Sequence, residues 1–136
     1  MKRYEDLEHD DGTVVRYRRH DNGDGLVAAG AHVAATAYIA SSAWVDPGAE
    51  VGANVRIGDH CWVEPGAKLQ PGAQLGTHVH VGRDAVVGTG ARLGSRVTVG
   101  SGAVVDPRAV IEAETSIPSR AVVRRSSRAS AWTPAA

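Results

Sequence analysis

The chain has 136 residues, a formal net charge of zero, one cysteine and no phenylalanine. A chain of this length forms one domain with a modest core, and its neutral charge argues against a nucleic-acid-binding protein that relies on a broad basic surface. The single thiol of Cys61 cannot form an internal disulfide, which fits a reducing compartment.

Residues 1–26 are expected to form an N-terminal cap. The first eight residues contain no apolar run that could serve as a signal peptide, and no later run is long enough to span a bilayer. We therefore expect a cytoplasmic protein without a membrane partner. Residues 13–19 predict a strand, and residues 21–25 predict a plain turn that lacks the later acid of a calcium-binding loop. An open stack of parallel strands exposes backbone groups at its end, and this segment would cover them.

From Val27 to Val123, every sixth residue is valine, isoleucine or leucine. A second, mostly small residue lies two positions before each of these aliphatic residues from Ala31 on, and the alternation of a strand puts both on one side. A helix of period 3.6 cannot keep a period of six on one face, and an antiparallel sandwich would need turns at spacings of about 8–12 residues. The repeat therefore predicts neither of these folds.

Six residues are enough for one short strand and one corner, so three repeats make a triangular coil of 18 residues. Such coils stack at the inter-strand distance of about 4.8 Å, and residues 27–123 hold between five and six of them. Turn-forming runs, of which Asp46-Pro47-Gly48 is one, supply the corners. The prediction is an all-β, single-stranded parallel β-helix whose narrow interior receives Cys61 as an inert side chain.

Residues 51–56, 57–62 and 99–104 carry the repeat most clearly, as an aliphatic residue, glycine, two variable residues, a small residue and one more variable residue. This pattern resembles the hexapeptide-repeat family of left-handed β-helices. The resemblance implies the left-handed sense of the coil. It also implies a homotrimer with ligand sites in the clefts between subunits.

Residues 18 apart are expected to be vertical neighbours on the surface of the β-helix. One outward column on one face then contains Trp44, Trp62, His80 and Thr98. A second column, at the corner leading into that face, contains Ser42, His60, His78, Arg96 and Glu114. Two tryptophans and three of the six histidines are thus predicted to share one patch.

Transfer of an acyl group from coenzyme A is the commonest activity in the family that the repeat resembles. There, a histidine in the inter-subunit cleft acts as general base on a hydroxyl or amine acceptor. The resemblance makes His80 the candidate base, with His78 and His60 as alternatives. Candidates for binding acetyl-CoA or another acyl-CoA are Trp62, Arg120 and Arg124, the two arginines through the phosphates. Against this hypothesis, the repeat has no inserted loop and lacks the family's usual closing segment.

Two alternatives remain open from the sequence. Three imidazoles within reach suit zinc, and His60, His78 and His80 are then the metal ligands of a protein similar to the γ-class carbonic anhydrases. The spacing departs from that class, because one residue separates His78 from His80. The other alternative is a non-catalytic structural, decoration or binding trimer, for which an unbroken repeat is suited. Residues 124–136 predict a basic, mobile tail.

Overall fold

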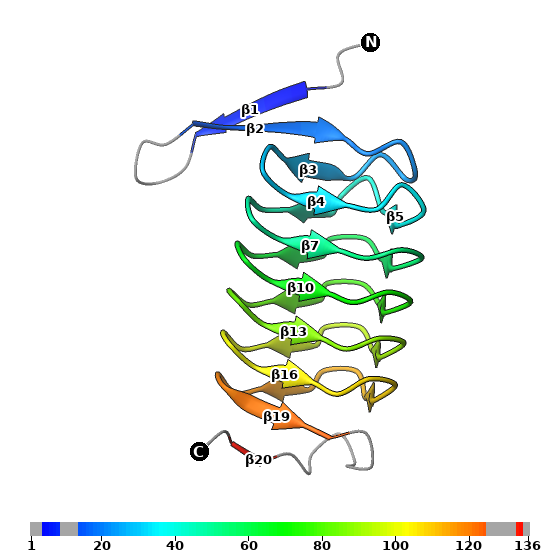
Figure 1. The fold of residues 1–136 in the computed structure, drawn as a ribbon, viewed down its shortest axis with the longest axis vertical. Helices are drawn as coiled ribbons and strands as arrows, with labels where there is room; N and C mark the ends of the chain where they lie inside the picture. The colour runs from blue at the N-terminus through cyan, green and yellow to red at the C-terminus, as the bar shows by residue number, and fades with distance from the viewer. Residues whose placement is uncertain (1–3, 9–13, 125–132, 135–136) are drawn as a thin grey trace.

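The structure, a computed structural model, describes residues 4–8, 14–124 and 133–134. All the regular secondary structure in these ranges is β-strand, and the strands from β3 on form a stack of about five coils (Figure 1). Because none of the described residues is helical, that part of the chain offers no helix that could cross a membrane. The predicted all-β, stacked-coil architecture is confirmed.

Three parallel sheets form the walls of the β-helix. The first wall contains β3 (Leu26–Ala28), β6 (Trp44–Val45), β9 (Trp62–Val63), β12 (His80–Val81), β15 (Thr98–Val99) and β18 (Ser116–Ile117). The second wall contains β4 (His32–Val33), β7 (Glu50–Val51), β10 (Lys68–Leu69), β13 (Val86–Val87), β16 (Val104–Val105) and β19 (Ala121–Val123). The third wall contains β5 (Tyr38–Ile39), β8 (Arg56–Ile57), β11 (Gln74–Leu75), β14 (Arg92–Leu93) and β17 (Val110–Ile111).

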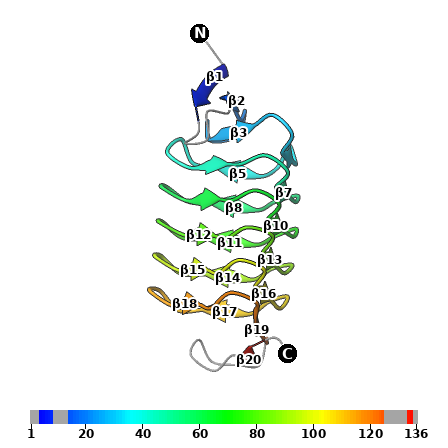
Figure 2. The ribbon, with the colours of Figure 1, turned by 90° about the vertical axis from the view of Figure 1, so that its left-hand side faces the viewer.

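The coil is left-handed. In Figure 1, strands β4, β7 and β10 run from left to right across the front, and the chain then returns behind them while it descends from the N-terminus. This sense is opposite to the usual crossover between parallel strands. Figure 2, turned by 90°, shows the third wall facing the viewer between β12, β15 and β18 on one side and β10, β13 and β16 on the other.

Each coil is in register with the next at a spacing of 18 residues. Trp62 of β9 pairs with Trp44 of β6 and with His80 of β12, and the neighbouring strand positions pair in the same way. In most of these two-residue strands the first side chain faces outward and the second is buried, because successive side chains of a strand point to opposite faces. The sequence prediction that residues 18 apart are vertical neighbours is confirmed.

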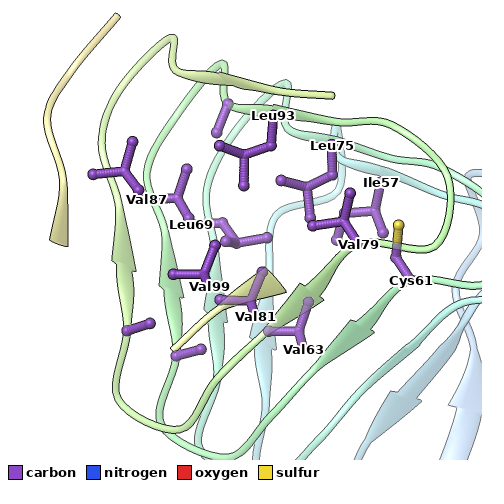
Figure 3. Packing of buried hydrophobic residues seen from close by; sticks show 14 of the residues in the cluster. Ile57, Cys61, Val63, Leu69, Leu75, Val79, Val81, Val87, Leu93 and Val99 are labelled. Carbon is purple, nitrogen blue, oxygen red and sulfur yellow. The ribbon is translucent and has the colours of Figure 1, made fainter. Parts of the chain in front are cut away.

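The interior is filled by the aliphatic residues of the repeat and the small residues two positions earlier. Figure 3 shows Cys61 in this core near Ile57 and Val79, and its side chain is fully buried. The Sγ–H of Cys61 lies 3.0 Å from the carbonyl oxygen of Gly76, to which it donates. Burial raises the pKa of this thiol from 9.0 to about 11, so it stays protonated at neutral pH.

An antiparallel hairpin covers the N-terminal end of the stack, where β1 (Tyr4–Glu8) pairs with β2 (Val14–Arg19) and β2 pairs with β3. The buried His20 follows β2, and its Nε2 lies 2.8 Å from the carbonyl oxygen of Ala37 near the third wall. At the other end, β20 (Thr133–Pro134) pairs with β19. The predicted mobile tail falls largely on residues 125–132 and 135–136, which lie outside the described residues.

Candidate functional site

Three aromatic rings stack along the first wall. The ring centroids of Trp44 and Trp62 are 5.5 Å apart with an interplanar angle of 27°, and those of Trp62 and His80 are 4.5 Å apart with an angle of 3°. All three side chains are half-buried. The parallel register of β6, β9 and β12 brings them together, because each ring stands one strand from the next.

The imidazole of His80 also contacts a carboxylate. Its Nε2 forms a hydrogen bond with Oε2 of Glu64, the first residue of the corner after β9. The side chain of His80 is 36% exposed and that of Glu64 is 21% exposed, so solvent reaches the pair. A histidine held by a carboxylate has a fixed tautomer and a fixed ring orientation, which is the arrangement that general-base chemistry uses.

A second carboxylate, that of Asp46, lies one coil earlier and is buried. Its Oδ2 accepts a hydrogen bond of 2.7 Å from Nε1 of Trp62, and its Oδ1 accepts one of 2.6 Å from the hydroxyl of Tyr17. Burial raises the pKa of Tyr17 above its ordinary value, and the neighbouring carboxylate of Asp46 raises it further. The hydroxyl of Tyr17 therefore stays protonated and donates its hydrogen bond to Asp46.

The predicted second column is also present. The imidazoles of His60 and His78 are 4.8 Å apart between centroids, with an interplanar angle of 31°. Both residues have left-handed backbone conformations, with φ of 60° and 58°, at the corner between the third and first walls. The amide of His60 donates to Oγ of Ser42 at 2.9 Å, and that hydroxyl donates to Oδ1 of Asp59 at 3.2 Å. Histidine is among the few residue types that adopt this conformation with some frequency.

The three predicted histidines form two separate groups. His60 stacks with His78, whereas His80 stacks with Trp62 and binds Glu64. Within the described ranges, no group of three or more histidine, cysteine, aspartate or glutamate side chains is placed to hold a metal ion. The hypothesis that these histidines are three ligands of a zinc ion is therefore not supported, because strand and corner positions put the rings in different stacks.

The two arginines predicted to bind phosphates are exposed and lie towards the C-terminal end of the stack. Arg120 occupies the corner after β18, and Arg124 follows β19. Strand β18 is two strands beyond β12, which places the corner of Arg120 about 10 Å from the level of His80 along the axis. Neither arginine belongs to the group of side chains around His80.

Neither Glu64 nor Asp46 was predicted from the sequence as a site residue, and Asp46 was expected only in a turn-forming corner. The signal that would have found them is their spacing. Glu64 precedes its partner His80 by 16 residues, and Asp46 precedes its partner Trp62 by the same 16. In a coil of 18 residues, this offset places the first residue of a corner diagonally beside the outward residue of the next strand in the same wall.

An open hollow of about 630 Å³ lies elsewhere, on the second wall. Its lining includes Arg18, His32, Glu50 and Lys68. Lys68 and Glu50 form an exposed pair at 4.0 Å, which contributes little to stability. None of the three candidate histidines lines this hollow.

Residues 54–89 match the family model described as bacterial transferase hexapeptide (six repeats). Together with the stacked coils of the structure, this match shows that residues 54–89 are hexapeptide repeats within a β-solenoid. The resemblance recognised in the repeat is confirmed. No curated protein matches the chain in sequence.

Several solved structures are similar to the chain. PerB from Caulobacter crescentus, in complex with CoA and GDP-perosamine, is 30% identical over 75% of this chain and 46% of that chain, with a TM-score of 0.35. A hexapeptide transferase family protein from Anaplasma phagocytophilum is 16% identical over 75% of this chain and 76% of that one, with a TM-score of 0.42.

The acetyltransferase domain of PglB from Neisseria gonorrhoeae, in complex with acetyl coenzyme A, is also similar. It is 26% identical over 73% of this chain and 53% of that chain, with a TM-score of 0.31. The chain spans about half the length of the perosamine N-acetyltransferase structures that it matches.

Proposed function

We propose that this protein transfers an acyl group from acetyl-CoA or another acyl-CoA to a hydroxyl or amine, with His80 as the general base. The observation that carries the proposal is the hydrogen bond between His80 and Glu64 on the solvent-accessible first wall. The match of residues 54–89 to a transferase repeat supports the same class of reaction.

The hydrogen bond decides which nitrogen of His80 is the base. With its proton on Nε2, the ring donates to Glu64 and leaves the lone pair of Nδ1 free. Nδ1 accepts the proton of the acceptor, and the acceptor oxygen or nitrogen bonds to the thioester carbonyl carbon. The carbon–sulfur bond then breaks, and the departing CoA thiolate takes the proton back from the imidazolium. Glu64 stabilises the positive charge that the ring carries between these two transfers.

The remaining candidates are assigned to the acyl-CoA. The half-buried indole of Trp62 beside His80 would be an apolar contact for the pantetheine arm. Arg120 and Arg124 would meet the phosphates, since their exposed guanidinium groups are suited to bidentate contacts with phosphate. A thioester carbonyl at His80 and phosphates at Arg120, about 10 Å further along the axis, are compatible with an extended cofactor lying along the first wall.

The protein is further proposed to act as a homotrimer in the cytoplasm. Val86, Val104 and Val122 form a vertical, half-buried apolar stripe on the second wall that would suit contact with a second copy. The free thiol of Cys61 fits a reducing compartment. Light scattering tests the assembly: the proposal expects three times the chain mass, and a monomer at micromolar concentration would contradict it.

A non-catalytic trimer is the second candidate function. The unbroken 18-residue register of the walls favours it, because a rigid stack without inserted loops is suited to a structural or binding role. It predicts a trimer that neither binds acetyl-CoA nor changes it.

The two functions are separated by calorimetric titration with acetyl-CoA and by measuring release of free CoA in the presence of a panel of small amine and hydroxyl acceptors. The transferase proposal expects binding and acceptor-dependent release. Replacing His80 with alanine should abolish release, whereas the same change at His60 or His78 should leave it intact. His32→Ala, on the second wall, is the matched control. Absence of binding at millimolar acetyl-CoA would contradict the proposal and favour the structural trimer.

A further inference from the structure

Each carboxylate oxygen of Asp46 accepts a hydrogen bond from a different part of the fold. One oxygen accepts from Tyr17 on β2 of the N-terminal hairpin, and the other accepts from the indole of Trp62 on β9. Asp46 is 3% exposed and Tyr17 is 1% exposed. A buried carboxylate with a donor on each oxygen is held rigidly, and it holds its donors in turn.

Trp62 connects this buried carboxylate to His80. Its indole is fixed at Nε1 by Asp46, and its face lies against the imidazole of His80 with an interplanar angle of 3°. The angle to Trp44 on the other side is 27°, so the flatter of the two stacks is the one with His80. A rotation of the indole away from Asp46 would therefore remove the surface that defines the plane of the imidazole.

The two carboxylates of Asp46 and Glu64 occupy equivalent positions in successive coils. Asp46 and Glu64 each begin an Xaa-Pro-Gly corner, and each binds the outward ring 16 residues later. The arrangement stops at the next coil, where Gly82 occupies the corresponding corner position and Thr98 the outward one. His80 thus has both a carboxylate at its edge and a tethered ring against its face.

We propose that Asp46 is a positioning residue, which holds the indole of Trp62 flat against His80 and thereby fixes the plane of the imidazole, with Tyr17 of the cap holding Asp46 in place. The inference deepens the proposed function, and its role in catalysis rests on that function. A base must be held close to its productive orientation for proton transfer. The N-terminal hairpin therefore contributes to the site although none of its described residues touches His80 in the observed network.

The test compares Asp46→Ala, Trp62→Phe and Tyr17→Phe with wild type, and uses Asp59→Ala as the control. Asp59 is an exposed acid on the adjoining corner that bonds Ser42. Trp62→Phe keeps an aromatic ring but removes the N–H that Asp46 accepts, and Tyr17→Phe keeps the ring of the cap and removes its hydroxyl. If Asp46→Ala fails to fold, these two milder variants still test the proposal.

The first readout is the position of the His80 ring-proton signals in NMR spectra, assigned by their loss in His80→Ala. These protons lie in the ring current of Trp62, so Asp46→Ala and Trp62→Phe should move them towards the values of an unstacked imidazole. The double variant should move them no further, because both changes break the same link. Unchanged signals in both single variants would overturn the proposal, as would an equal shift in Asp59→Ala.

The second readout is the rate of CoA release at saturating substrates. Asp46→Ala and Trp62→Phe are expected to lower kcat about 10-fold. If the wild-type protein is inactive but the His80 signals shift in Asp46→Ala and Trp62→Phe, the proposed function is wrong and the positioning network stands. An active wild-type protein in which kcat is unchanged by Asp46→Ala would contradict the positioning role alone.

Discussion

The indole of Trp62 and the imidazole of His80 lie face to face, one coil apart, with their centroids 4.5 Å apart. This distance is close to the spacing of about 4.8 Å between neighbouring strands, so the stack follows directly from the pairing of β9 with β12. A repeat of six residues thus does more than build a core. It also places outward side chains in columns where rings contact each other without any loop to support them.

The buried residue of each strand should dominate stability. We expect Leu75→Ala to lower the free energy of unfolding by about 2–5 kcal/mol, because it leaves a cavity in a narrow interior. Gln74→Ala, the exposed residue just before it, should change this energy by less than about 0.5 kcal/mol. Urea denaturation of both variants measures the difference. Equal effects would contradict the assigned inward and outward positions.

The tight stacking of the corners should make some corner glycines costly to replace. A Cβ added at Gly58 would lie 2.4 Å from the carbonyl oxygen of Gly76 in the next coil, so Gly58→Ala should destabilise the fold by about 1–3 kcal/mol. Gly90 has φ of +69° and a nearest contact of 3.5 Å, and asparagine tolerates this conformation. Gly90→Asn should therefore cost under about 1 kcal/mol. Thermal unfolding of the two variants tests the order, and a reversed order would mean that the coils are spaced differently.

The buried thiol of Cys61 should make the free energy of unfolding depend on pH in the alkaline range. Its pKa is raised from 9.0 to about 11 in the folded state, so an unfolded chain ionises at lower pH than the folded one. The stabilisation is fully present below pH 9 and is lost as the pH rises to about 11, amounting to about 3 kcal/mol.

The matched variant for this prediction is Cys61→Ala, whose unfolding energy should fall less steeply over the same pH range. Urea titrations at several pH values measure both slopes, and identical slopes would contradict the prediction. Thiol labelling gives an independent check: native protein should react slowly with an exposed-thiol reagent and denatured protein rapidly.

Binding of acyl-CoA should depend on the arginines at the C-terminal end. If these arginines contact phosphates, Arg120→Ala and Arg124→Ala should each raise the Kd for acetyl-CoA by about 3- to 10-fold. The increase should be larger at low ionic strength. Arg92→Ala, an exposed arginine of the third wall, is the control and should leave Kd unchanged. Calorimetry at two salt concentrations tests this, and equal Kd values for all three variants would show that Arg120 and Arg124 do not contact the cofactor.

The period of the sequence predicted the columns but could not predict which members of a column interact. Spacing by 18 correctly placed Trp62 between Trp44 and His80, and His60 beside His78. Ring orientation depends on whether a residue stands on a strand or at a corner, and spacing does not specify it. The histidines therefore seemed from sequence to form one cluster, whereas the structure divides them between two stacks.

The carboxylates were missed for a related reason. Asp46 and Glu64 precede proline and glycine, and in that setting an acid has a sufficient explanation as a turn residue. Their second role depends on a diagonal contact with the next coil. The contact of Tyr17 with Asp46 was beyond prediction, because the cap lies outside the repeat and no period fixes its register.

The most direct test of the account is the effect of His80→Ala on acyl transfer at a constant affinity for acetyl-CoA. The proposed function predicts that wild type binds acetyl-CoA and releases CoA in the presence of an amine or hydroxyl acceptor, and that the variant releases CoA at least about 100-fold more slowly with an unchanged Kd. Equal rates of CoA release by the two proteins would contradict the assignment of His80 as the base.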